Sequence, residues 1–150
     1  MDIETALKIL SKYTSRVYPS NSHGGTDEKI DLSGVCLEGA DLTRIGNLRR
    51  WNFAGANLVN ANLVEVDATG ANFHGADLSG ANLTGAILRC ADLRGSKLME
   101  TGIAFGEIKD ADIRGTDFSK IGKPSNLLWE TAKGDRATVL PPATKWPPQW

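Results

Sequence analysis

Large apolar residues recur at every fifth position from residue 32 to residue 118, and polar or small residues fill most positions between them. There are 18 such apolar centres in tandem, with one extra residue inserted between Leu42 and Leu48. A period of five fits neither an α-helix, on which such steps rotate by about 140°, nor a flat strand, on which odd steps alternate between faces. The centres can share one interior only if the backbone turns a corner in every unit.

The residues around each centre are typical of turns. The residue before the centre is Asn or Asp in 13 of the 18 units, and the residue two after it is Gly in nine. Asn and Asp side chains bond to the nearby backbone, and Gly reaches positive φ, so both favour corners. The residue two before the centre is Ala in nine units, which is small enough to face inward. The pattern predicts a solenoid of stacked coils that bury their apolar sides against one another.

The A-[ND]-[LF]-x-G units, clearest in TGANFHGADLSGANLTGAILRCADL, resemble the pentapeptide repeat family. The resemblance implies an all-β solenoid, a right-handed quadrilateral β-helix with four units per coil. Eighteen units divided by four give about 4.5 coils. Two irregularities are expected to be accommodated locally. The undersized centre Ala68 is compensated by the larger Val66 beside it, and the insertion forms a bulge at residues 43–47.

Three segments follow from this pattern: residues 1–29, 30–120 and 121–150. The first is expected to form a short N-terminal capping helix and a loop, with a membrane or partner helix as the alternative. The last is expected to form an irregular C-terminal cap and a proline-rich tail that runs back along one side of the rod. We expect Leu127, Leu128 and Trp129 to plug the last coil, and a PxxP-type ligand for a partner is the alternative for the tail.

The chain offers little that resembles a reaction centre. Its Cys and His residues show no metal-binding spacing, and its glycines are corners rather than a phosphate-binding loop. Cys36 and Cys90 are predicted to lie too far apart for a disulfide. Asp92 and Asp112 stack one coil apart but face solvent on a convex rod. We therefore expect no enzyme activity, no cofactor, no metal, and no catalytic residue.

A period of four units places residues 20 apart in one column, and this register predicts a basic strip on two adjacent sides of the rod. The candidate partner-binding residues are Arg89, Arg94, Lys109 and Arg114, with Phe105 at a corner. The alternative is an ordinary solvated surface, since Asp92, Asp110 and Asp112 lie among these cations.

Charge and hydropathy limit the partners. The net charge of −1 makes direct nucleic acid binding unfavourable, and no stretch is apolar enough for a membrane span. These features predict a cytoplasmic structural or interaction module, a monomer or weak dimer, that binds an unknown protein. The family resemblance implies one alternative: some members mimic DNA and inhibit or protect DNA gyrase. The 12 acidic and eight basic residues of the repeat make such mimicry poor.

Overall fold

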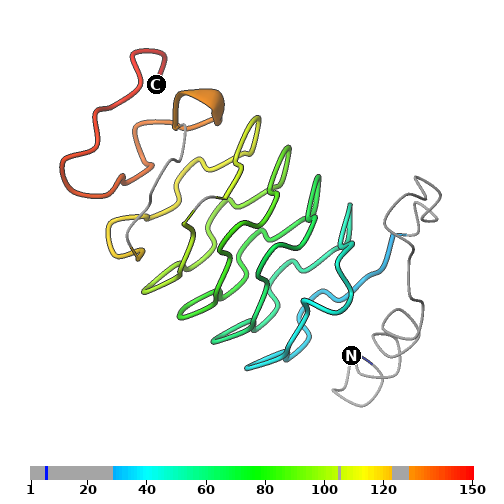
Figure 1. Ribbon diagram of the computed structural model, residues 1–150. Coiled ribbons are helices and arrows are strands. Elements are labelled where there is room, and N and C mark those ends of the chain that lie inside the picture. The colour runs from blue at the N-terminus through cyan, green and yellow to red at the C-terminus, as the bar shows by residue number, and fades with distance from the viewer. Residues whose placement is uncertain (1–5, 7–28, 105, 123–128) are drawn as a thin grey trace.

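The computed structural model describes Ala6 and residues 29–104, 106–122 and 129–150. Its repeat region is a short rod of stacked coils (Figure 1). Parallel bridges join residues that are 20 apart in the sequence, from Asn47↔Asp67 to Lys97↔Asp117. Because 20 residues make four units, each coil has four sides, and every side stacks on the same side of the next coil. This register is the quadrilateral β-helix that the resemblance to the pentapeptide repeat family implies.

The centres define the four sides of the rod. Side 1 holds Leu48, Ala68, Leu88 and Ile108; side 2 holds Phe53, Phe73, Leu93 and Ile113; side 3 holds Leu58, Leu78, Leu98 and Phe118; side 4 holds Leu63, Leu83 and Ile103. Leu32, Leu37 and Leu42 form a first, N-terminal layer on sides 2, 3 and 4. We call the residue before each centre the ladder residue and the residue two before it the inner residue.

One unit shows how the backbone makes a side and then a corner. The N–H of the ladder residue Asn82 donates to Ala61 O in the previous coil at 2.9 Å, and the N–H of Leu83 donates to Gly102 O in the next at 2.6 Å. The Asn82 Oδ1 accepts from the N–H of Thr84 at 3.1 Å, and the N–H of Ala86 closes the turn on Leu83 O at 3.0 Å. Each side is thus a single bridge followed by a turn. Among the described residues the only helix with defined bounds is the 3-10 helix η1, Trp129–Thr131, and Ala6 is also helical.

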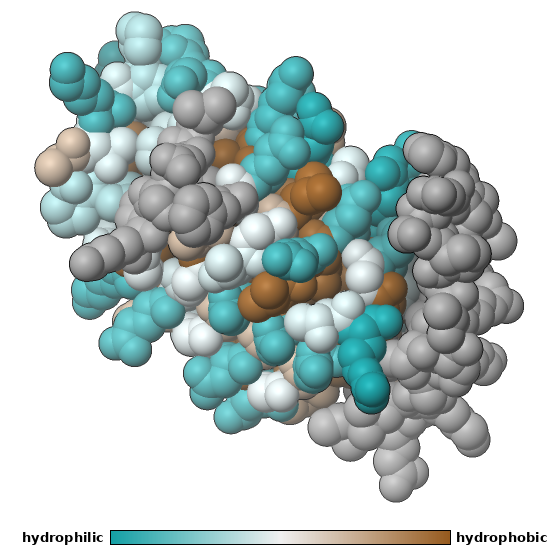
Figure 2. Space-filling view, viewed as in Figure 1, coloured by the Kyte–Doolittle hydropathy of each residue, from teal (hydrophilic) through white to brown (hydrophobic). Residues whose placement is uncertain are grey.

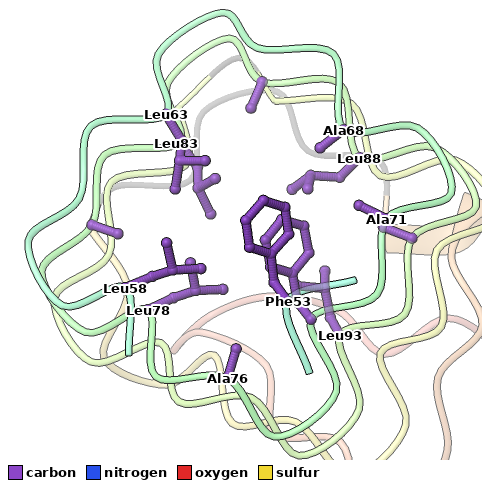
Figure 3. Close-up of a cluster of buried hydrophobic side chains, with 14 of the residues drawn as sticks. Phe53, Leu58, Leu63, Ala68, Ala71, Ala76, Leu78, Leu83, Leu88 and Leu93 are labelled. Carbon is purple, nitrogen blue, oxygen red and sulfur yellow. The ribbon is translucent and has the colours of Figure 1, made fainter. Parts of the chain in front are cut away.

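The centres and inner residues fill the interior of the rod (Figure 3). Phe53 and Phe73 stack face to face, with ring centroids 5.1 Å apart and planes only 4° from parallel. Trp51 takes an inner position that usually holds Ala, and its ring lies 6.1 Å from that of Phe53. Val66 and Ala68 are both fully buried, as expected of a pair that exchanges volume between two positions.

The second residue after a centre adopts positive φ at most corners, whether or not it is glycine; Arg44 and Lys120, at the first and last irregular corners, are exceptions. Six corners place a larger residue in this region, with φ between 55° and 59°: Arg50, Asn60, Glu65, Cys90, Glu100 and Asp110. Left-handed backbone is unfavourable for residues with a Cβ, so the stacking of the coils must impose it. The corner is therefore a property of the fold, which glycine favours but does not cause.

The inserted residue is absorbed at Gly46. Ile45 is buried and its N–H closes the turn on Leu42 O at 3.1 Å, as inner residues do elsewhere, and Gly46 follows it with φ 66° before the ladder resumes at Asn47. The carbonyl of Gly46 still accepts the N–H of Asp67 at 2.8 Å. The bulge thus lies within the predicted range 43–47, and the bridges that span it join residues 21 apart instead of 20.

The coil continues beyond the recognisable repeat. Lys133 pairs with Asp112 and Val139 pairs with Asp117, so residues 129–140 form one more, irregular layer. Trp129 packs edge-on against Phe118 at 5.1 Å, and Leu140 is buried. Sequence reasoning placed the end of the repeat at residue 120, because this layer lacks the Asn-Leu-x-Gly signals.

The proline-rich tail does not run back along the rod as expected. It folds into two turns, in which Thr144 N–H donates to Pro141 O and Trp150 N–H donates to Pro147 O. It then lies at the C-terminal end of the molecule (Figure 1). Each of these turns begins at a proline, whereas the prolines of a PxxP ligand lie in extended backbone.

Two predicted features of the ends fall largely on residues outside the described part of the chain. They are the N-terminal capping helix with its loop, and Leu127 and Leu128 of the predicted plug. Ala6 is fully buried within the hydrophobic core cluster, which is the one described contact that bears on a cap at the N-terminal end.

Candidate partner-binding surface

The predicted basic strip occupies sides 1 and 2. The bridge Ile87↔Glu107 stacks the units of Arg89 and Lys109, and the bridge Asp92↔Asp112 stacks those of Arg94 and Arg114. Each cation directly follows a centre, so its side chain points outward, and all four residues are exposed. Phe105, the fifth predicted residue, lies outside the described part of the chain.

Arg94 and Arg114 are held by carboxylates of their own units. Arg94 donates through Nε and Nη2 to the two oxygens of Asp92, at 2.9 and 2.7 Å. Arg114 repeats this geometry on Asp112 with the same two distances. We call each such pair an Asp–Arg fork. The Arg94 Nε also lies 3.6 Å from Asp112 Oδ2, so the two forks form one ladder along the rod.

The forks arise from the spacing Asp-x-Arg around a buried centre. The ladder residue and the residue after the centre both face outward, which places the two side chains next to each other. The carboxylate also accepts the backbone N–H of its arginine, at 3.0 Å for Asp92. Two-pronged arginine–carboxylate pairs are the geometrically specific kind of ion pair.

The remaining two cations of the strip differ from each other. Arg89 Nε lies 3.1 Å from Glu107 Oε1 in the next coil, and Arg49 contacts Asp67 in the same way at 3.2 Å. Lys109 forms no ion pair with a residue of the described part of the chain. Lys109 is therefore the cation of the strip that a partner could pair with at the least cost.

The two Asp–Arg forks lower the pKa values of their carboxylates. The pKa of Asp92 lies below its ordinary value because Arg94 donates hydrogen bonds to the carboxylate, although partial burial opposes the shift. The pKa of Asp112 is lowered in the same way by Arg114. Both carboxylates therefore stay ionised at neutral pH, and neither is suited to act as a general acid.

These acids change the electrostatic character of the strip. Its four cations are balanced by four neighbouring acids, Asp92, Glu107, Asp110 and Asp112, so the local net charge is zero. Sequence reasoning named Asp92, Asp110 and Asp112 as diluting charges but missed Glu107 and the forks. The recurring Asp-x-Arg spacing was the signal that could have revealed them.

Other chemistry is sparse among the described residues. No group of three or more His, Cys, Asp or Glu side chains there could hold a metal ion. Cys36 and Cys90 are free and exposed, and His74 is exposed. The buried hydroxyls are engaged: Thr101 and Thr116 donate to backbone carbonyls at 2.7 Å. No helix within the described ranges is long and apolar enough to cross a membrane.

Comparison with known proteins identifies the repeat. Residues 47–85 and 76–103 match the family model of pentapeptide repeats, in 8 copies. No curated protein sequence matches the chain. Among solved structures, the chain is similar to a pentapeptide repeat protein, Rfr23, from the cyanobacterium Cyanothece 51142, with 26% identity and a TM-score of 0.59. That match covers 63% of each chain.

Two further structures share the fold. One is alr5209, a pentapeptide repeat protein from Nostoc, with 19% identity, a TM-score of 0.58, and coverage of 93% of this chain and 97% of that one. The other is QnrB1, a plasmid-mediated fluoroquinolone resistance protein, with 20% identity, a TM-score of 0.62, and coverage of 75% and 56% respectively. The chain thus spans less than two thirds of Rfr23 and QnrB1. These similarities imply the right-handed quadrilateral β-helix that the family resemblance of the repeat suggests.

Proposed function

Since this chain belongs to the pentapeptide repeat family, we propose that it is a non-catalytic module that binds another protein. The proposed contact surface is the basic strip of Arg89, Arg94, Lys109 and Arg114, together with Phe105, which the sequence register predicts at a corner. One observation carries this proposal: the two stacked Asp–Arg forks hold long side chains in fixed positions outside a packed interior.

Fixing these side chains before binding favours association. An unrestrained arginine loses about 0.5–1.5 kcal/mol of conformational freedom when a partner immobilises it. The carboxylates of Asp92 and Asp112 reduce this loss for Arg94 and Arg114. A fork uses the Nε and Nη2 atoms of each guanidinium and leaves the donors of Nη1 for a partner.

The charge balance indicates the kind of partner. A strip of zero net charge suits a protein surface on which both signs alternate, rather than a uniformly acidic one. Phosphate backbones need an excess of cations, so direct nucleic acid binding is unfavourable here. On the face of the rod shown in Figure 2, a few apolar residues gather near the middle and hydrophilic ones surround them. The strip itself consists of charged, exposed side chains, which suit a polar interface of modest affinity.

We further propose that the module works in the cytoplasm as a monomer or weak dimer. The two free, exposed cysteines support this setting, because thiols stay reduced in the cytosol.

Affinity capture with matched variants tests the proposal. Charge reversal of Arg89, Arg94, Lys109 and Arg114 is expected to abolish capture of the partner from a lysate of the source cell. The control reverses four cations that lie elsewhere: Arg44, Lys97, Lys120 and Arg136. Both variants change the net charge equally and leave the core intact. If both lose the partner, or both keep it, the strip is not the contact surface.

The alternative, a DNA mimic that inhibits or protects DNA gyrase, needs exposed negative charge along the rod. Five acids of the repeat instead lie in ion pairs: Asp67, Asp77, Asp92, Glu107 and Asp112. A supercoiling assay with purified gyrase decides this point. We expect no change in activity and no protection from a fluoroquinolone, and either effect would favour the mimic.

A further inference from the structure

The last layer of the rod ends in an edge that would accept another coil. On side 2, the carbonyls of the inner residues Ala71, Ala91 and Ala111 each accept a backbone N–H from the following coil, at 2.8–2.9 Å. Ala132 is the next inner residue in this column, because Lys133 is the ladder residue that pairs with Asp112. Its carbonyl therefore faces the open end of the rod. Such an edge is a template for pairing with another chain.

Side chains of the tail occupy this edge in place of a coil. The indole Nε1 of Trp150 donates to Ala132 O at 3.3 Å, and the amide Nε2 of Gln149 donates to Glu130 O at 2.9 Å. Trp150 is itself positioned by the turn on Pro147 and by edge-to-face contact with Trp146, at 6.1 Å between ring centroids.

The indole also replaces a missing centre. The column of centres on side 2 ends at Gly134, which has no side chain to cover the end of the core. A Cβ added to Gly134 would lie only 2.5–2.6 Å from three ring atoms of Trp150. A residue with a Cβ at this position would therefore displace the ring.

We propose that Gln149 and Trp150 form a latch that closes the C-terminal edge and prevents the rod from pairing end to end with a second copy of this chain. A second copy is the occupant that the edge fits, since a two-fold axis would bring the same open C-terminal edge of two chains together. The latch is held by two side-chain hydrogen bonds and one half-buried ring, whereas the inner coils are held by backbone ladders on every side. It is therefore the contact in this layer that opens most readily.

Two variants open the latch in different ways. Replacing both Gln149 and Trp150 by alanine removes its groups. Gly134→Ala keeps both side chains, but its Cβ would overlap the ring of Trp150 and displace it. We expect both variants to associate, with dimer dissociation constants lower than that of the native chain on the order of tenfold or more. Gly102→Ala is the control for the glycine change, since a Cβ there meets only ordinary contacts at 3.4 Å and beyond.

Sedimentation velocity over a range of concentrations measures association, and circular dichroism confirms that each variant is folded. Spin labels at Lys133 should approach each other in the dimer, while labels at Ser33, in the first layer, should stay far apart. Folded variants that remain monomeric would overturn the proposal, and so would a dimer with close Ser33 labels. Unfolding of both variants would also contradict it, because the tail would then be needed for the fold rather than for closing an edge.

Discussion

Truncating a centre should cost far more stability than truncating the outward residue next to it. Leu83 is fully buried on side 4, between Leu63 and Ile103 in the coils on either side. Leu83→Ala removes three carbons, which is about 2.4 kcal/mol of transfer free energy at about 0.8 kcal/mol each. The N–H of Leu83 donates a hydrogen bond to the next coil, and the N–H of Leu63 donates to Asn82 O at 2.8 Å, so both backbones are held in place. The cavity can therefore collapse little, and we expect a total loss of roughly 3–5 kcal/mol.

The chain itself supplies a compensating variant. Ala68 is a natural alanine centre, and its inner neighbour is Val66 rather than Ala. Adding Ala81→Val to Leu83→Ala copies that arrangement on side 4. The double variant should recover part of the lost stability, although Ala81→Val alone should destabilise by about 1–3 kcal/mol through overpacking.

Urea denaturation followed by circular dichroism measures these differences, with Thr84→Ala as the outward control. We expect Thr84→Ala to change the free energy of unfolding by less than about 0.5 kcal/mol. Equal shifts for Leu83→Ala and Thr84→Ala would refute the assignment of inside and outside. If Ala81→Val made Leu83→Ala worse, the idea that volume is exchanged between centre and inner residue would be wrong.

Three further predictions concern the corners, the forks and the N-terminal end. Cys90→Gly should raise the free energy of unfolding by up to about 1 kcal/mol, because this position has φ 55°. Gly75→Ala, at φ 66°, should lower it by about 1–2 kcal/mol for the same reason. Thermal unfolding measures both changes. The lowered pKa values of Asp92 and Asp112 contribute stability that is fully present above the unfolded value of about 3.9 and is lost as pH falls through the folded values. Asp92→Asn with Asp112→Asn should therefore flatten the acid limb of a stability–pH curve, and an unchanged limb would contradict the forks. Deleting residues 1–18 should cause aggregation or dimerisation by uncovering the first layer, and a monodisperse monomer with an unchanged Tm would argue against a cap.

A solenoid with a corner in every unit could be predicted from sequence because it depends on a strict local period, whereas its four sides came from the resemblance to the pentapeptide repeat family. A buried centre every five residues and small or turn-forming neighbours leave few other solutions. The bulge at Gly46 could be located to within a few residues for the same reason, since one extra residue breaks the period at one place. Columns of side chains, and hence the basic strip, follow once four units of five residues are taken to make one coil, because residues 20 apart then stack on one another.

The layer at residues 129–140 could not be predicted in this way. Its centres are Trp129, Gly134 and Leu140, whose spacings of five and six residues carry no consensus signal, and its inner residues are Ala132 and Thr138. The ladder of the preceding coil imposes its structure. The neutralisation of the strip was missed for a different reason: the register places cations in columns, but pairing depends on which neighbours reach them. Glu107 lies 18 residues after Arg89 and approaches it only because the coils stack.

The count of four units per coil underlies the core, the strip and the latch, and spin labels test it most directly. With Cys36 and Cys90 replaced by serine, labels are placed in pairs at Ser79 and Arg94, Ser79 and Met99, or Ser79 and Ala104. Coils of three, four or five units would stack the first, second or third pair, with backbones about 5 Å apart. The N–H of Gly80 donates to Met99 O at 2.7 Å, so strong dipolar broadening is expected for Ser79 with Met99 only. Broadening that was strongest for either other pair would contradict the four-sided rod.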